Sequence, residues 1–301
     1  MKKFVLKVLL FFTCVVVMDL VFGQLFSYLR AHAKGGSTAN CEYIANQCQA
    51  DIIILGSSRA THHYVPQIIE DALGLTCYNC GEEGNGVVLA YGRFKMLTNR
   101  YKPKLILYEM TPGYDYGTLE PNTKYLGYLR QYYKKDGIKD LFHDFDDELS
   151  SLKMLSQMYQ NTAKLLPNLF DNIAFRDNQK GYSPLYGQME DVNNANNNDD
   201  NTLDIDCIKL SYVERIIAEA QDLGVPIVFM ISPKYGMHNN SIQYQPEIDI
   251  CYGRGIPYYN YLNYEGISNR AIFFQDRGHL NDEGAKNYTM LILPIIRKYI
   301  N

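Results

Sequence analysis

The chain has 301 residues, enough for one α/β domain of ordinary size and an insertion. Its formal net charge is −4, so the charge balance gives no sign of nucleic acid or another polyanion as a partner. Tyrosine is abundant, at 26 residues, and tryptophan is absent. Tyrosines stack on sugars but more often fill a core, and composition alone leaves both interpretations open.

The first 33 residues are predicted to form a membrane anchor. Three lysines within the first seven residues precede an apolar run at 8–18, which residues 20–26 extend after Asp19. Together the two stretches approach the length of about 20 residues that spans a bilayer. The basic flank predicts an N-terminus inside and the rest of the chain on the far side. A cleaved signal peptide is the alternative, because residues 31–33 (Ala-His-Ala) weakly fit a cleavage site.

Residues 34–301 are predicted to form one α/β domain in which apolar strands alternate with helical patterns. Strands are expected at 51–56, 76–79, 104–110, 226–231 and 257–261, and helices at 66–73, 87–99, 208–223 and 282–298. This alternation predicts a doubly wound, flavodoxin-like parallel sheet in a three-layer α/β/α sandwich.

An insertion is expected at about 113–206, with helical patterns near 136–142 and 147–171. Its Asn/Asp-rich tract at 193–201 is low in apolar residues and is predicted to be a mobile loop. Long insertions on α/β folds often build lids or partner surfaces, so we expect one of these roles here.

Two distant motifs carry the chemistry. The apolar run at 52–55 stops at Gly56, and Ser57 and Ser58 follow at the carboxyl end of the predicted strand, where open α/β sheets bind their ligands. A serine there is either a helix cap or a nucleophile. Near the C-terminus, Asp276 and His279 are three residues apart. That spacing lets the carboxylate orient the imidazole, whose other nitrogen can then accept a serine proton.

The two motifs together resemble those of the SGNH (GDSL-type) hydrolase superfamily. Gly56-Ser57-Ser58 stands where that family has Gly-Asp-Ser, which implies Ser58 as nucleophile, and Asp276 with His279 matches its last block. The resemblance covers roughly residues 50–110 and 205–300. Within that superfamily, the chain resembles in particular the membrane-anchored proteins that act in polysaccharide and teichoic-acid acylation.

The resemblance also implies an oxyanion site. Gly84 is the best match to the family's oxyanion glycine, with Gly81 and Gly86 as rivals, and Asn85 and Arg59 are further candidates for oxyanion or substrate binding. The family's third block normally supplies Gly-x-Asn-Asp after the third strand, but residues 109–112 read Glu-Met-Thr-Pro. One expected oxyanion donor is therefore missing.

The histidines and cysteines do not predict a metal site or a cofactor. His62 and His63 are neighbours, which point apart on a turn or helix, so contact with substrate or solvent is expected instead. Cys77 and Cys80 form a C-x-x-C motif, but no second ligand pair accompanies them, and buried thiols are predicted rather than zinc or redox chemistry. A disulfide such as Cys41 with Cys48 stays open.

The sequence thus predicts a serine-dependent esterase or O-acyltransferase, most simply an acetyl one, that is held at the membrane and acts outside the cytoplasm on a cell-surface glycan. A membrane-bound acyltransferase is an expected partner. The alternative is an inactive protein of the same fold, either a partner in an acylation machinery or a carbohydrate-binding protein.

Overall fold

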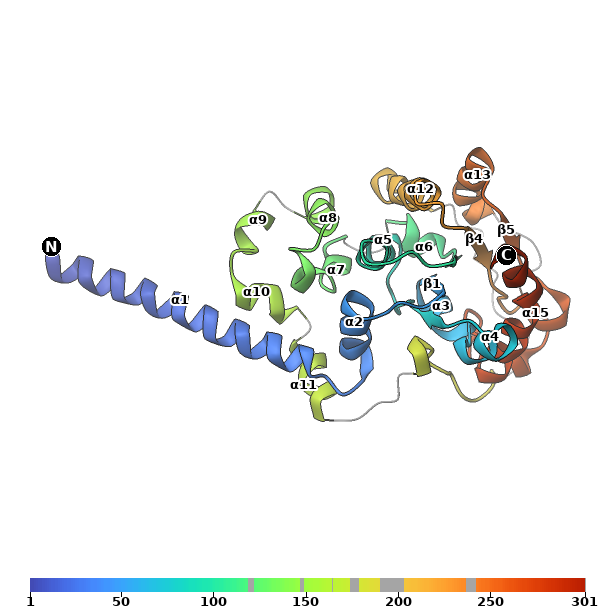
Figure 1. The fold of residues 1–301 in the computed structure, drawn as a ribbon, viewed down its shortest axis with the longest axis horizontal. Coiled ribbons are helices and arrows are strands. Elements are labelled where there is room, and N and C mark those ends of the chain that lie inside the picture. Colours follow the sequence, from blue (N-terminus) through green and yellow to red (C-terminus); the bar gives the residue numbers. More distant parts are fainter. Residues whose placement is uncertain are drawn as a thin grey trace. The chain divides into compact units, whose positions relative to one another are not determined.

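A computed structural model of the chain describes residues 1–118, 122–146, 149–163, 165–173, 179–189, 203–236 and 242–300. The predicted mobile tract at 193–201 lies outside the described residues. The chain divides into two compact units (Figure 1). Unit 1 contains residues 1–47 and 122–177, and unit 2 contains residues 48–121 and 178–301.

Unit 2 is built on a five-stranded sheet in the order β2-β1-β3-β4-β5, in which every neighbouring pair is parallel. The flavodoxin-like doubly wound fold predicted from the sequence is therefore confirmed. The strands are β1 Ile52–Gly56, β2 Cys77–Asn79, β3 Leu105–Glu109, β4 Ile227–Ile231 and β5 Tyr258–Asn260. Each lies within one residue of the predicted range at either end.

The helices of unit 2 connect and cover these strands. They are α3 Ser58–His63, α4 Pro66–Leu73, α5 Val87–Thr98, α6 Pro112–Asp115, α12 Cys207–Asp222, α13 Gln245–Arg254, α14 Glu265–Ser268 and α15 Asp282–Ile300. Short 3₁₀ turns occur at Gln179–Gly181, Ile242–Tyr244 and Ala271–Phe273. Helices α4 and α15 pack together, as do α5 and α12, and the sheet lies between the two pairs (Figure 1).

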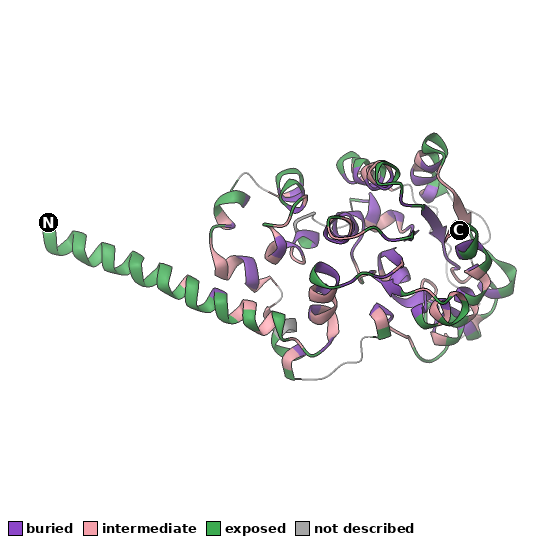
Figure 2. Ribbon diagram, in the orientation of Figure 1, coloured by how far each residue is buried: buried purple, intermediate pink, exposed green. Residues whose placement is uncertain are grey.

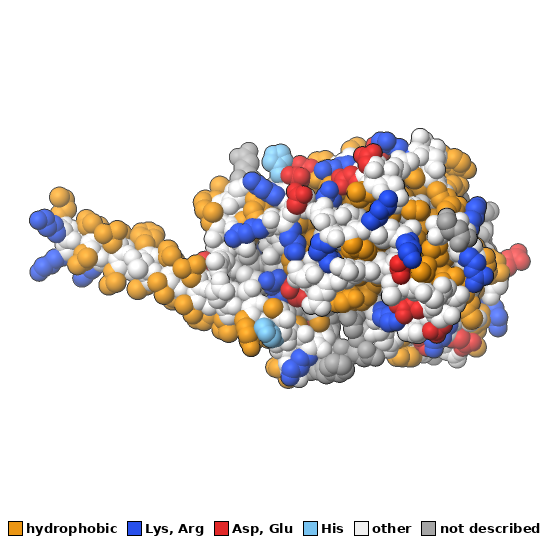
Figure 3. Space-filling view, viewed as in Figure 1, with side chains coloured by type: hydrophobic (Ala, Val, Ile, Leu, Met, Phe, Trp, Pro, Cys, Tyr) orange, Lys and Arg blue, Asp and Glu red, His pale blue; other side chains and the backbone are white. Residues whose placement is uncertain are grey.

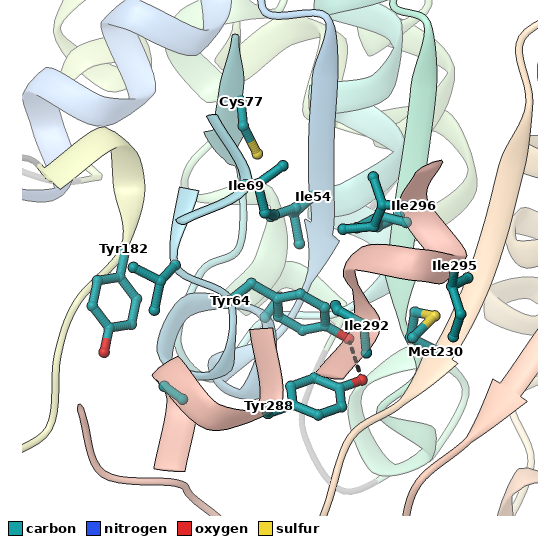
Figure 4. Close-up of a cluster of buried hydrophobic side chains, with 14 of the residues drawn as sticks. Ile54, Tyr64, Ile69, Cys77, Tyr182, Met230, Tyr288, Ile292, Ile295 and Ile296 are labelled. Atoms are coloured by element: carbon teal, nitrogen blue, oxygen red, sulfur yellow. Dashed lines mark hydrogen bonds between the residues drawn. The ribbon is translucent and has the colours of Figure 1, made fainter. Parts of the chain in front are cut away.

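The core forms because the strands are apolar on both faces. All five residues of β1 are buried, as are all five of β3 and of β4. Ile54 projects towards Ile69 of α4 and Ile292 of α15, in a cluster that also includes Tyr64 and Tyr288 (Figure 4). Burial on both faces is what a central strand of a parallel sheet requires, and it explains why unit 2 contains most of the buried residues (Figure 2).

Unit 1 is helical in its described residues. Its elements are α1 Lys2–Ala31, α2 Gly36–Asn46, α7 Asn122–Leu126, a 3₁₀ turn at Arg130–Tyr132, α8 Ile138–Phe145, α9 Ser150–Lys153, α10 Gln157–Thr162 and α11 Leu165–Ile173. The predicted helical stretch at 147–171 is thus broken into three short helices. Helix α1 is long and apolar enough to cross a membrane, with a mean hydropathy of 2.5 in its best window.

The insertion predicted at 113–206 is divided between the units. Residues 122–173 belong to unit 1 with α1, whereas residues 113–118, 179–189 and 203–206 belong to unit 2. All seven cysteines are free, so Cys41 and Cys48 form no disulfide, and Cys77 and Cys80 are buried thiols as predicted.

Candidate active site

The site lies at the carboxyl end of the sheet, between β1 and β3. In a sheet of this order the chain changes direction between these strands, and such switch points leave a crevice for ligands. Ser58 begins α3 two residues after β1 ends. Gly56 makes the intervening turn with a φ of 140°, and a Cβ there would lie 2.8 Å from the Glu109 carbonyl oxygen. Only glycine fits this turn, which places Ser58 at the edge of the sheet.

The structure brings Ser58, His279 and Asp276 together. The Ser58 hydroxyl lies 2.8 Å from His279 Nε2, and His279 Nδ1 lies 2.9 Å from Asp276 Oδ2. If Nδ1–H donates to the carboxylate, Nε2 is left unprotonated and accepts the serine proton. This is the arrangement of a Ser-His-Asp triad, and it joins residues that are 221 positions apart in the sequence.

Asp276 also shapes the loop that carries the histidine. Its Oδ1 accepts backbone N–H groups from Gly278 at 2.7 Å and from His279 at 2.9 Å. The hydrogen bond from the His279 side chain, followed by these backbone donors, holds the pKa of Asp276 below its usual value, although partial burial opposes this. The carboxylate therefore stays ionised and can stabilise the imidazolium that forms when His279 takes a proton.

His63 supports the triad from beneath. It is fully buried, and its Nε2 accepts the backbone N–H of Leu280, next to His279, at 3.0 Å. Its Nδ1–H must then donate to Ser232 Oγ, which lies 2.7 Å away, and the serine hydroxyl donates to Glu109 Oε1 at 2.6 Å. Burial is the largest cause that keeps the pKa of His63 well below the usual value, which agrees with a neutral ring. This differs from the substrate or solvent contact predicted for His63.

His62 faces a different way, as expected for a neighbouring residue. Its Nδ1 lies 2.6 Å from the Ser183 carbonyl oxygen and its Nε2 lies 3.2 Å from Glu83 Oε1. Both partners are acceptors, so the geometry fits a doubly protonated ring. The His62 and His279 rings meet edge to face, with centroids 5.6 Å apart. His62 therefore links the Glu83 loop to the triad.

The three candidate oxyanion glycines of this loop, Gly81, Gly84 and Gly86, have different surroundings. Gly81 N–H already donates to Asn79 Oδ1 at 3.0 Å, and a Cβ on Gly86 would lie 2.2 Å from the Tyr114 carbonyl oxygen, so both are structural. Gly84 has a φ of 63°, and the described residues give its N–H no partner. Its neighbour Glu83 contacts His62, which keeps this part of the loop beside the triad.

Two predicted binding residues have structural roles instead. The Arg59 side chain is buried in an ion pair with Glu109, and it also donates to Tyr244 Oη and to the Met110 carbonyl oxygen, both at 2.9 Å. Asn85 is buried as well, and its amide donates to the Glu83 carbonyl oxygen at 2.8 Å. Both side chains thus make internal contacts where substrate or oxyanion contacts were predicted.

Glu109 explains the departure in the third block. This buried carboxylate accepts from Arg59, from the Tyr64 hydroxyl, and from both the backbone and the hydroxyl of Ser232. A buried charge needs such donors. Glu109 takes the first position of the third block and anchors Arg59 beneath the site, whereas Thr111 stands where the resemblance places the asparagine donor. Sequence analysis missed this cluster, although Glu109 and Ser232 both end neighbouring apolar strands.

A second pair of buried acids lies near this cluster. Asp115 accepts the Thr111 N–H at 2.5 Å and the Tyr108 hydroxyl at 2.7 Å, and the buried carboxyl group of Glu247 lies close enough to interact with it. Burial raises the pKa of Asp115 to about 7 and that of Glu247 well above its usual value. Two carboxyl groups that share a dry site hold a proton between them.

No protein-family model matches the sequence, and no curated protein matches it. Among solved structures, the chain is similar to a protein assigned as an acylhydrolase from Bacteroides fragilis, at 12% identity and a TM-score of 0.42, over 88% of this chain and 98% of that one. It is also similar to a protein assigned to the G-D-S-L lipolytic family from Desulfitobacterium hafniense, at 9% identity and 0.40, over 81% and 99%.

A third similar structure is a catalytic mutant of an acetylxylan esterase from Geobacillus stearothermophilus, at 10% identity and a TM-score of 0.40, over 83% of this chain and 93% of that one. These descriptions name the kind of protein that the Gly-Ser-Ser and Asp-x-x-His motifs resemble.

Proposed function

We propose that unit 2 is a serine ester hydrolase. The observation that carries the proposal is the continuous hydrogen-bonded path from Ser58 Oγ through both His279 nitrogens to Asp276. Its groups are also accessible to a substrate, because the His279 side chain is 29% exposed and that of Asp276 is 57% exposed. A nucleophile, a base and an orienting carboxylate in this order are the parts that acyl transfer requires.

The proposed reaction proceeds in the following steps. Ser58 Oγ attacks the acyl carbonyl while His279 Nε2 takes the hydroxyl proton, and Asp276 stabilises the resulting imidazolium. The N–H groups of Ser58 and Gly84 donate to the oxyanion, a contribution of a few kcal/mol per donor in comparable sites. His279 then gives the proton to the leaving alcohol, which departs and leaves the acyl group on Ser58. Water attacks this ester while His279 takes its proton, and His279 returns the proton to Ser58 as the acid is released.

A serine-directed phosphonate tests the proposal directly. Full-length protein in detergent is treated with a fluorescent alkyl phosphonate, and peptide mass spectrometry locates the label. We expect the label on Ser58 and loss of labelling in Ser58→Ala and His279→Ala. Ser57→Ala is the matched control, because the Ser57 hydroxyl is buried without a partner among the described residues. Labelling of Ser57, or of no serine in the site, would remove the proposal and favour an inactive protein of this fold.

For the substrate, we propose an O-acetyl or similar acyl ester on a glycan outside the cytoplasm. Helix α1 and its three N-terminal lysines support this, since a basic flank favours an N-terminus inside. A membrane anchor limits the range of an esterase but suits an enzyme that receives an acyl group from a membrane-bound acyltransferase.

Acyl transfer is the second candidate. It is favoured by the same helix and by the absence of the third-block donor, because Thr111 stands in place of the asparagine. We therefore expect slow hydrolysis of an activated acetyl ester and faster turnover when a glycan acceptor is added. If no acceptor speeds loss of the acyl group while acetylated glycan is hydrolysed rapidly, the protein is an esterase and the transferase proposal fails.

A further inference from the structure

Unit 1 carries a concentrated set of exposed apolar side chains beyond those of α1. Six of them are more than half exposed, and Leu169 is 38% exposed. We call this set the apolar collar: Leu149, Leu152, Leu155, Leu166, Leu169, Phe170 and Ile173. Single exposed leucines are common on protein surfaces, but seven exposed apolar side chains within 25 residues of one unit are an unusual concentration.

Helix α11 shows that this exposure is not incidental. Residues 166, 169, 170 and 173 have the i, i+3, i+4, i+7 spacing of one helical face, and that face points outwards. The opposite side carries Asp171, which is only 3% exposed and accepts the Thr38 N–H at 3.2 Å. An ordinary surface helix buries its apolar face and exposes its charges. This one does the reverse, as expected where the medium outside is lipid.

Helix α10 is attached to the apolar segment of α1 through Asp19. The Asp19 carboxylate accepts the Ser156 hydroxyl, the Gln157 N–H at 2.9 Å and the Met158 N–H at 3.1 Å. It thus satisfies the free donors at the start of α10. Gly23 lets the helices touch, because a Cβ there would lie 2.5 Å from Gln157 Cβ. The helix that faces Asp19 therefore comes from the same chain.

The position of Asp19 fixes the depth of α10. Asp19 lies about 24 Å along α1 from Lys3 at a rise of 1.5 Å per residue. The hydrocarbon core is about 30 Å thick, so a helix that enters at Lys3 still lies in lipid at Asp19. Every residue of α1 up to Met18 is exposed, and the hydrogen bonds between α10 and α1 begin at Asp19. The start of α10 is thus held near the far boundary of the hydrocarbon.

An open hollow beside this junction is also apolar. It measures about 500 Å³ and is lined by Val15, Met18 and Phe22 of α1 and by Met158, Tyr159 and Thr162 of α10. Its lining continues the apolar surface of α1, along which hydrophobic side chains gather in Figure 3. A hollow of this kind suits the acyl chain of a lipid.

We propose that α9, α10 and α11 lie in the membrane, with the apolar collar in the boundary region of the leaflet that faces the rest of the chain. The collar, α1 and the hollow then form one continuous lipid-contacting surface. The contacts of Asp19 also require that α1 be retained, because cleavage near residue 31 would remove the cap of α10. A signal peptide that is cut away does not fit this arrangement.

Single tryptophans can measure this directly, since the native chain has none. Full-length Leu155→Trp, Leu166→Trp and Ile173→Trp proteins are reconstituted into phosphatidylcholine vesicles. Quenching is then compared between lipids brominated on the acyl chains and acrylamide in the water. Phe11→Trp reports insertion of α1, and Tyr252→Trp is the control in unit 2, where Tyr252 is 71% exposed against 75% for Leu155. Circular dichroism checks that each variant is folded.

We expect the three collar tryptophans to be quenched by brominated lipid at least about threefold more than Tyr252→Trp, with bromines near the headgroup more effective than deep ones. Phe11→Trp should respond most to deep bromines. If acrylamide quenched the collar tryptophans as strongly as it quenches Tyr252→Trp, the collar would be in water and the proposal would be overturned. Protection from both quenchers would also overturn it, because a second copy or another protein would then cover the collar. Failure of Phe11→Trp to respond to lipid would overturn it as well. None of these results depends on catalysis by Ser58.

Discussion

The described part of unit 2 contains two groups of a serine, a histidine and an acid, and they are connected in different orders. In the exposed group, His279 stands between Asp276 and Ser58. In the buried group, Ser232 stands between Glu109 and His63. The residue types are the same, but only the first order leaves a serine hydroxyl aimed at a basic nitrogen.

This difference shows that the order of the hydrogen bonds and the exposure of the side chains decide whether a group can attack an ester. Ser232 donates its proton to Glu109, and the Nε2 lone pair of His63 is used by the Leu280 N–H. Ser232 and His63 are also completely buried, so no acyl group can reach them. The buried group has no free base and no free nucleophile. Its role is to hold the residue next to His279, and each prediction below tests this division.

Replacing the two serines should give the largest contrast. We expect Ser58→Ala to lower kcat/KM for an activated acetyl ester by at least about 10³-fold, because nucleophile and base act as a unit. Ser232→Ala should lower it by about tenfold or less. It should instead lower the unfolding temperature, since Glu109 loses a buried donor. Ester hydrolysis and thermal unfolding measure the two effects. If both variants were folded and lost activity equally, the two groups would not have separate roles.

Asp276→Asn tests the order within the exposed group. The asparagine oxygen can still accept the Gly278 and His279 N–H groups, but its amide would favour a proton on His279 Nε2 in place of Nδ1. That tautomer cannot accept the serine proton, and a loss of about 10² to 10⁴ in kcat is expected. The exposed Asp249→Asn is the control. A folded Asp276→Asn enzyme with native kcat would show that Asp276 does not orient the base.

His63 should have a smaller effect, of the kind a positioning residue gives. His63→Ala removes the acceptor of the Leu280 N–H, so we expect kcat to fall by about ten- to a hundredfold while KM changes little. His63→Gln keeps a carbonyl oxygen in reach and should recover part of kcat. If kcat fell equally in both variants, in proportion to their loss of thermal stability, the role of His63 would be purely structural.

The buried acids predict a pH effect on stability rather than on catalysis. The pKa values of Asp115 and Glu247 are raised in the folded state. A carboxyl group with a raised folded pKa stabilises the protein below its unfolded pKa, and this contribution is lost as the pH rises through the folded pKa, about 7 for Asp115.

Glu247→Gln should weaken this dependence, because an amide can donate to Asp115 without a titrating proton. The difference in unfolding free energy between about pH 5 and about pH 8 should shrink by about 1 to 3 kcal/mol. Urea unfolding at the two pH values measures it, with Glu265→Gln as the control. An unchanged difference would mean that these acids do not share a proton in the folded protein.

The sequence by itself determined the sheet and the three residues that form the exposed group. The three central strands β1, β3 and β4 are short apolar runs buried on both faces, and such runs do not depend on distant partners to be recognised. Gly56 with Ser58, and Asp276 with His279, are local patterns in which spacing alone fixes the geometry. Helix α4 was likewise predicted to the residue, because Pro66 and Gly74 mark its two ends.

Only the tertiary structure decided what neighbouring side chains do. Arg59 follows Ser58 directly, yet its guanidinium turns inwards because Glu109, 50 residues away, needs a cation in a buried site. His62 and His63 are adjacent but contact Ser183 and Ser232, which are 121 and 169 residues away. The insertion is divided between the units because Asp19 caps one of its helices. The free energy of a buried polar group depends on partners brought from elsewhere in the chain, and no local pattern contains them.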